Sequence, residues 1–192
     1  MTYDIKNVFY LDTELTIATG STIGLSDTVQ LDLSAYIDPI ARGRTMGTGL
    51  AIYKVHYSIS GTSEGFQPVS PTGTGVFRCG LIAGAGLGTQ ASANLGGTAD
   101  SVTANNALAV FGFDYYMPKS VIANASVPGP LNKTFMEPSK EVPYVVVRDN
   151  VCAVSTAKVE VGATTYVSFR LECAQIKLDQ QTLNQLLRTQ TV

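Results

Sequence analysis

Histidine is the side chain best suited to acid–base chemistry near neutral pH, and this sequence contains one, His56. A metal site of the cupin kind needs several clustered imidazoles and carboxylates, which a single histidine does not supply. A serine hydrolase would pair His56 with a nucleophile, but the chain has no GxSxG segment. We therefore interpret His56 as a strand residue at the edge of the core or in a subunit contact. The sequence predicts no catalytic site and no bound metal.

A glycine-rich segment, Gly84–Gly88 (GAGLG), resembles the fingerprint of a dinucleotide-binding turn. The third glycine of that fingerprint is missing, because Thr89 occupies its place, and no amphipathic helix follows. The chain also lacks the GxxxxGK pattern of a phosphate-binding loop. We interpret the segment as a turn that opens a long loop, and we predict no cofactor.

Glycoside hydrolysis needs two carboxyl groups that meet only in the folded chain, so their spacing in the sequence cannot reveal them. Most acidic residues here are expected to be outward-facing strand residues. The candidates are Asp12, Glu14, Asp32, Asp114, Glu137, Glu160 and Glu172. Asn124 and Asn132 match glycosylation acceptors by chance, because the first residues carry charges where a signal peptide needs an apolar run.

The three cysteines, Cys79, Cys152 and Cys173, are odd in number and lack CxxC spacing. Each lies among apolar residues of an expected strand. We predict that all three are free, buried thiols in a protein made in a reducing cytosol.

Charged residues make up 15% of the chain, against ~25% in an average soluble domain. A surface rich in small uncharged residues costs little to desolvate, so we expect neighbouring molecules to cover part of it. The net charge is −2, and Lys6 is the only basic residue among the first 40. Proteins that bind nucleic acid need clustered cations, so no specific nucleic-acid binding is expected. No apolar run approaches the ~20 residues of a membrane-spanning helix.

Two long segments far apart in the sequence alternate between apolar and polar residues, as half-buried strands do. In residues 49–60 (GLAIYKVHYSIS), this alternation predicts one face with Ala51, Tyr53, Val55, Tyr57 and Ile59, and a second face with Leu50, Ile52, Lys54, His56 and Ser58. In residues 164–178 (TTYVSFRLECAQIKL), it separates Val167, Phe169, Leu171 and Cys173 from Ser168, Arg170 and Glu172. We expect the two strands to close a sheet by long-range pairing.

Shorter segments with apolar alternation or valine-rich runs predict further strands over 9–18, 28–37, 76–83, 108–117, 143–147 and 151–155. The last two flank Arg148–Asn150, which favours a hairpin turn. A short helix is predicted after Leu178, with Asp179 as its N-cap and Leu178 packed against Leu183. Its apolar stripe consists of Leu183, Leu186 and Leu187.

These elements predict an all-β protein: one domain over residues 1–192, a single jelly roll or antiparallel β-sandwich of about eight strands with a short C-terminal helix. Two long connections interrupt the strands, Gly84–Asn106 and Val121–Leu131, and together they hold one ionisable side chain, Asp100. Loops of this length tend to carry interaction surfaces. We expect both to make contacts between subunits.

The pattern of the whole chain resembles single-jelly-roll viral capsid proteins. The residues behind this are TVQLDLSAYIDP (28–39) followed by GLAIYKVHYSIS (49–60), then loops of small residues and a strand near the C-terminus. The chain is most similar to the small capsid proteins of sphaerolipovirus-like viruses, which are tailless and contain a membrane. The resemblance implies a structural virion protein that self-assembles into an icosahedral shell of hexagonal or pseudo-hexagonal capsomers. It also implies partners, namely copies of itself, other capsid proteins and an internal virion membrane, and synthesis in the host cytoplasm.

Two alternatives stay open. One is a carbohydrate-binding or adhesive β-sandwich, in which Tyr115, Tyr116 and Tyr144 would form an aromatic surface, although the chain has no tryptophan. The other is a β-sandwich glycoside hydrolase that uses two of the carboxylates named above.

Overall fold

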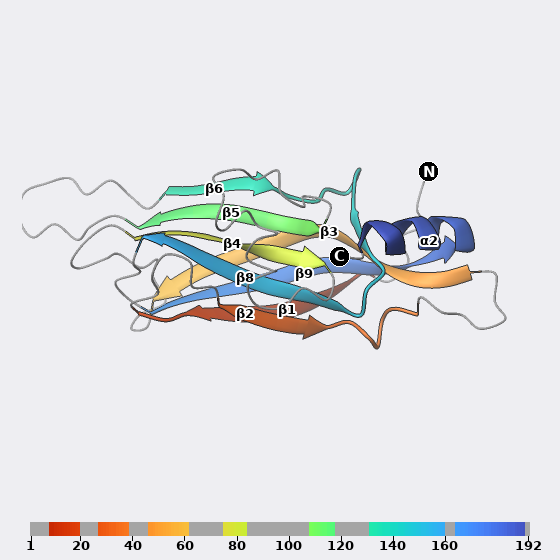
Figure 1. The fold of residues 1–192 in the computed structure, drawn as a ribbon, viewed down its shortest axis with the longest axis horizontal. Coiled ribbons are helices and arrows are strands. Elements are labelled where there is room, and N and C mark those ends of the chain that lie inside the picture. Colours follow the sequence, from red (N-terminus) through yellow and green to blue (C-terminus); the bar gives the residue numbers. More distant parts are fainter. Residues whose placement is uncertain are drawn as a thin grey trace, which may run out of the picture.

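The computed structural model describes residues 8–19, 27–38, 46–61, 75–83, 108–117, 131–159 and 164–190. Within these ranges, nine strands form two antiparallel sheets and one helix follows the last strand. The two sheets lie face to face, and the helix lies at one end of the elongated sandwich (Figure 1).

The first sheet has four strands and the second has five. In spatial order, the four-stranded sheet consists of β1 (Phe9–Ile17), β9 (Thr165–Asp179), β3 (Met46–Gly61) and β7 (Tyr144–Val146). The five-stranded sheet consists of β2 (Thr28–Asp32), β8 (Asn150–Val159), β4 (Gly75–Ala83), β5 (Ala109–Met117) and β6 (Leu131–Met136). The helix is α2 (Gln180–Thr189).

The order of the strands defines the topology. β1 pairs with β9, β2 with β8, β3 with β7 and β4 with β5, all antiparallel. The chain is thus a long antiparallel hairpin whose paired arms alternate between two sheets, which is the jelly-roll arrangement. The predicted fold class is confirmed, with β6 as one strand more than expected.

β3 and β9 are the longest strands and pair with each other from Met46↔Asp179 to Gly61↔Thr165, as the alternation predicted. The register shifts once, between Ile52↔Cys173 and Lys54↔Glu172, so Tyr53 is the extra residue of a β-bulge. The bulge reverses the faces of β3, because one added residue exchanges inward and outward positions. Ile52 and Val55 therefore both face the core between the sheets, and the prediction that Ala51 and Tyr53 share that face with Val55 is wrong.

The core between the sheets is dominated by aromatic rings. Phe111, Phe113 and Tyr115 of β5 are fully buried there, as expected for the aromatic segment 108–117. Tyr57 of β3 stacks on Phe113, with 4.3 Å between ring centroids, so the rings bridge the two sheets. Each such ring removes ~150–250 Å² from water, which makes this cluster a main source of stability.

A second cluster lies on the outer side of the four-stranded sheet, under α2. The Asp179 side chain caps the helix as predicted, accepting a hydrogen bond from Thr182 N at 2.7 Å. Leu178 and Leu183 are both buried in this cluster, and Leu186 and Leu187 pack against it. Gly47 of β3 lets the helix approach, because a Cβ at that position would lie 2.9 Å from Leu183 Cδ2.

The end of the helix also covers the edge of β7, which is the last strand of its sheet. The Gln190 amide donates from Nε2 to the Val145 carbonyl at 2.6 Å and accepts from Val147 N at 3.1 Å. Gln190 is itself buried, and its own carbonyl accepts from Arg148 Nε at 3.1 Å. The side chain thus replaces a neighbouring strand and leaves this edge unavailable for pairing with another chain.

Three strand predictions need correction. β2 ends at Asp32 rather than continuing to Ile37, because the Asp32 carboxylate accepts from Ser34 N and turns the chain. β6 lies between the predicted strands 108–117 and 143–147, where the sequence predicts no strand. The predicted hairpin around Arg148–Asn150 is wrong, since β7 and β8 belong to different sheets and the chain crosses between them there.

Cys79, Cys152 and Cys173 are all buried and unpaired, so the prediction of three free thiols is confirmed in the fold. Burial raises the pKa of each thiol, to about 12 at Cys173. Within the described ranges, no helix is long and apolar enough to cross a membrane. Some of the predictions concern residues that lie outside the described ranges. These residues are the segment 84–106, which includes Gly84–Gly88, the segment 121–130, which includes Asn124, and Glu160.

Candidate functional site

The outer side of the four-stranded sheet, beyond the part that α2 covers, carries a group of polar side chains from three strands. Because strands β1, β9 and β3 are in register, Asp12 lies opposite Arg170, and Arg170 lies opposite His56. Two residues further along β1, on the same side of the sheet, Glu14 lies opposite Ser168 of β9. We call this surface the polar face and define it by Asp12, Glu14, His56, Ser168, Arg170 and Glu172.

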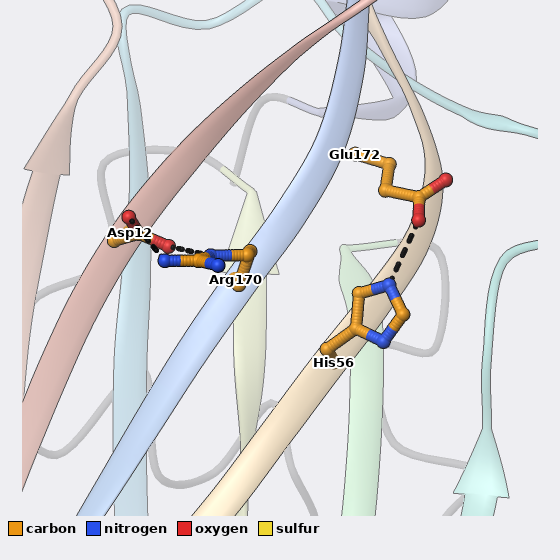
Figure 2. A network of polar contacts seen from close by, with 4 residues as sticks. All are labelled: Asp12, His56, Arg170 and Glu172. Carbon is orange, nitrogen blue, oxygen red and sulfur yellow. Dashed lines mark hydrogen bonds and ion pairs between the residues drawn. The ribbon is translucent and has the colours of Figure 1, made fainter.

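Asp12 and Arg170 form a bidentate ion pair between β1 and β9 (Figure 2). Arg170 donates from Nε to Asp12 Oδ1 at 2.7 Å and from Nη2 to Oδ2 at 3.3 Å. The hydrogen bond and the positive charge of Arg170 lower the pKa of Asp12, and Asp12 raises the pKa of Arg170 in return. Both groups therefore stay ionised at neutral pH.

His56 reaches across to Glu172, with 2.8 Å between Nε2 and Oε1 (Figure 2). This contact runs diagonally, because the direct neighbour of His56 on β9 is Arg170. The hydrogen bond from His56 lowers the pKa of Glu172, and the nearby charges of Lys140 and Lys54 lower it further. His56 is 46% exposed, so it lies on the surface of the strand and not at the edge of the core.

Glu14 completes the face by accepting a hydrogen bond from Ser168 Oγ at 2.9 Å. The surface between these groups is a shallow, open depression of about 600 Å³, lined by residues of β1, β3 and β9. Small-molecule sites are usually enclosed and lined mostly by apolar side chains, whereas this depression is open and most of the residues that line it are polar or charged.

The protonation state of the carboxyl groups limits which reactions the polar face could catalyse. A glycosidase needs one carboxyl group with a raised pKa to act as the acid. Asp12 and Glu172 have lowered pKa values, so at neutral pH they accept hydrogen bonds and do not donate protons. In the described part of the chain, no three His, Cys, Asp or Glu side chains gather as they would around a metal ion.

The structure separates the candidate carboxylates. Asp12, Glu14 and Glu172 share the polar face, whereas Asp32 caps the turn after β2. Asp114 pairs with Arg78 on the opposite outer face of the sandwich, with 2.6 Å between Oδ1 and Nε. Glu137 is exposed in the segment after β6, and Glu160 is not among the described residues.

The aromatic surface proposed for carbohydrate binding does not form from the residues named for it. Tyr115 is fully buried in the core, where its ring lies 4.9 Å from that of Phe77, and burial raises its pKa to about 12. Tyr144 packs against the same core and is half-buried. Tyr116 is the residue that follows Tyr115 on β5, so it points to the opposite side of the sheet.

Sequence reasoning placed Ser168, Arg170 and Glu172 on the outward side of β9, but it did not identify them as one site with β1. The alternation of β9 was the available signal. What it could not show is the pairing of β1 with β9, which joins residues 158 positions apart in the chain. Tyr10 was also missed; it is exposed at the start of β1, with its ring centre 5.9 Å from the Arg170 guanidinium.

No protein-family model matches the chain, and no curated protein sequence matches it. Among solved structures, the chain is similar to VP1 of Trichodysplasia spinulosa-associated polyomavirus in complex with GM1 oligosaccharide, with 9% identity over 93% of this chain and 99% of that chain and a TM-score of 0.44. Merkel cell polyomavirus VP1 in complex with disialyllactose gives 9% identity, coverage of 93% and 98%, and a TM-score of 0.44. Apo New Jersey polyomavirus VP1 gives 6% identity, coverage of 89% and 100%, and a TM-score of 0.43. These identities and scores are too low to assign a family or a function.

Proposed function

We propose that the protein is a structural virion protein, a capsid subunit that self-assembles into an icosahedral shell. The observation that carries this proposal is the polar face, where the ionised groups pair with one another on an open surface of the sheet. Such a surface suits contact with a neighbouring molecule better than chemistry on a small substrate. A jelly roll hosts many functions, so the fold supports the proposal only together with this surface.

The composition supports the same proposal. With 15% charged residues, the chain has less charge than a solitary soluble domain usually carries. Charged residues are scarcest in the segments 84–106 and 121–131, where Asp100 is the only ionisable residue. We propose that both segments add contacts between subunits, as their composition suggests.

The partners and the location follow from the resemblance of the sequence to sphaerolipovirus-like small capsid proteins. We propose that the chain binds copies of itself, other capsid proteins and an internal virion membrane, and that it is made in the host cytoplasm. With a net charge of −2, it is expected to bind nucleic acid weakly and without sequence preference. On this proposal the protein is not an enzyme.

Assembly tests the proposal directly. The purified chain is concentrated at neutral pH and followed by sedimentation velocity, and the product is imaged by negative-stain electron microscopy. Capsomers or closed shells are expected, with a size that depends on protein concentration. A chain that stays monomeric at high concentration and in high salt would overturn the capsid proposal.

A carbohydrate-binding module remains the second candidate because of one residue. Tyr10 is 58% exposed beside the depression of the polar face, and an exposed aromatic ring next to hydrogen-bonding side chains suits a sugar. A glycan array with the native chain and with Tyr10→Ala tests this candidate. A specific signal that disappears in the variant would support it.

A further inference from the structure

Opposite charges lie at the two margins of the polar face. β1 contributes the exposed carboxylates of Asp12 and Glu14, and β3 contributes the exposed Lys54 at the other side. Lys140 lies near the same side, because its charge acts on Glu172 and its segment leads into β7, the neighbour of β3. The middle strand is balanced, since Arg170 and Glu172 carry opposite charges.

Exposed apolar side chains lie at the same two margins. Val8 and Tyr10, at the start of β1, are 50% and 58% exposed. Val142 is 74% exposed and lies in the turn before β7, where Ser139 N donates to the Val142 carbonyl. Each margin therefore combines apolar area with an excess of one charge: the β1 margin carries Asp12 and Glu14, and the β3 margin carries Lys54 and Lys140 against the exposed Glu141.

Both margins also have accessible sheet edges within the described structure. β9 is the one described strand that pairs with β1. On the other side, the described pairing of β7 with β3 covers only Leu50–Ile52, so no strand pairing is described there for the part of β3 that carries Lys54. A second molecule can pack on either margin without displacing a described strand.

We propose that these margins bind each other between copies of this chain. The acidic margin (Val8, Tyr10, Asp12 and Glu14) of one copy contacts the basic margin (Lys54, Lys140 and Val142) of the next copy. This head-to-tail contact uses two different surfaces and closes into a ring when the rotation between copies allows it. The inference rests on the proposed capsid function and names the surface through which neighbouring subunits meet.

The balance of charge favours a second copy over another partner. A strongly anionic partner would be attracted by Lys54 and Lys140 and repelled by Glu14, and a cationic partner would meet the opposite conflict. A copy of the chain offers both signs in the matching order. The contact also brings Val8 and Tyr10 of one copy to Val142 of the next, which removes apolar surface from water.

Two charge reversals at exposed positions test the contact. Glu14→Lys places a positive charge on the acidic margin, and Lys140→Glu places a negative charge on the basic margin. Each variant alone is expected to self-associate about tenfold more weakly than the native chain, because like charges then face each other. A mixture of the two variants is expected to recover association, since alternating copies restore opposite charges at both kinds of contact.

Lys177→Glu is the matched control, because it makes the same charge change at an exposed position of β9 outside the two margins. Circular dichroism of all three variants verifies folding, and sedimentation velocity measures association. If the native chain assembles and both reversals assemble equally well, the inference is wrong while the capsid proposal stands. If the native chain does not associate at all, the capsid proposal fails and the contact fails with it. Loss of a glycan signal in Glu14→Lys with unchanged assembly would assign this face to a carbohydrate instead.

Discussion

Two arginine–aspartate pairs of the same design lie on opposite outer faces of the sandwich. Arg170 and Asp12 are register partners on β9 and β1, and Arg78 and Asp114 are register partners on β4 and β5. The Nε–Oδ1 distances are 2.7 Å and 2.6 Å. The side chains of the first pair are 61% and 59% exposed, whereas Arg78 is 10% exposed and Asp114 is 39% exposed.

The surroundings of the two pairs explain this difference. On the outer face of the five-stranded sheet, the Phe135 ring lies 4.7 Å from the Arg78 guanidinium. Phe135 fits there because Gly112 has no side chain; a Cβ at Gly112 would overlap the Phe135 ring. Ile82 and Val154 on this face are fully buried. Among the described residues, none covers the polar face in this way, and the side chains of Arg170 and Asp12 are accordingly exposed to water and available to a partner.

The largest expected effect comes from breaking the partly buried pair, Arg78 and Asp114. Asp114→Ala should lower the free energy of unfolding by roughly 2–4 kcal/mol, because Arg78 keeps its charge in a poorly solvated place. This is below the roughly 3–5 kcal/mol typical of fully buried pairs, since Asp114 is 39% exposed. Urea unfolding measures the change. Asp12→Ala makes the same change on the polar face and should alter the midpoint much less.

The comparison also predicts that a second substitution restores part of the stability that Asp114→Ala removes. Adding Arg78→Met to Asp114→Ala removes the charge that lost its carboxylate and should recover part of the stability. If Asp12→Ala destabilises the chain as much as Asp114→Ala does, the two faces do not differ in solvation as their exposed fractions indicate.

A smaller effect is expected at the end of the four-stranded sheet that α2 covers. Gln190→Leu keeps the size of the side chain but removes its hydrogen bonds to Val145 and Val147. The loss of these buried hydrogen bonds should cost about 1–3 kcal/mol. Gln185→Leu makes the same change at an exposed position of α2 and serves as the control. Urea unfolding gives the stability, and light scattering should detect aggregation through the uncovered edge of β7.

These residues also show how far the sequence alone could lead. Local alternation identified most of the strands and the outward side of β9, because it reflects which side chains face water. The cap at Asp179 was predictable, since capping depends on neighbours in the chain. The buried hydrogen bonds of Gln190 were not, because they join residues more than 40 positions apart, as the separation of 43 from Val147 shows.

Two features that the sequence analysis did not predict, β6 and the reversal of faces in β3, have causes in the local sequence. β6 (LNKTFM) mixes polar and apolar residues because its first four side chains are exposed at the edge of a sheet, so it lacks a clear alternation. Around Tyr53, the run Leu50–Val55 is apolar except for Lys54, so its residues are compatible with either face of a strand. The β-bulge at Tyr53 determines which side chains of β3 face the core, and it can be recognised only from the pairing of β3 with Cys173 and Glu172 of β9.

The smallest effect concerns the response of the polar face to acid. The hydrogen bond with His56 and the nearby charges of Lys140 and Lys54 lower the pKa of Glu172 below its ordinary value of 4.5. A carboxyl group with a lowered pKa in the folded state contributes stability above its unfolded pKa and loses that contribution as the pH falls through the folded pKa. Glu172→Gln removes this contribution at all pH values. The native chain should therefore be slightly more stable than Glu172→Gln above about pH 4.5, and the difference should vanish at lower pH.

Urea midpoints of both proteins between pH 6 and pH 3 measure this difference, roughly spanning the range over which carboxyl groups titrate. High salt should reduce it, because the groups of the polar face are exposed and mobile ions screen their interaction. The Asp114–Arg78 pair provides the contrast: its contribution should depend less on salt, since Arg78 is only 10% exposed. A difference at Glu172 that persists at pH 3, or that salt leaves unchanged, would mean that this carboxylate stabilises the sheet by packing rather than by charge.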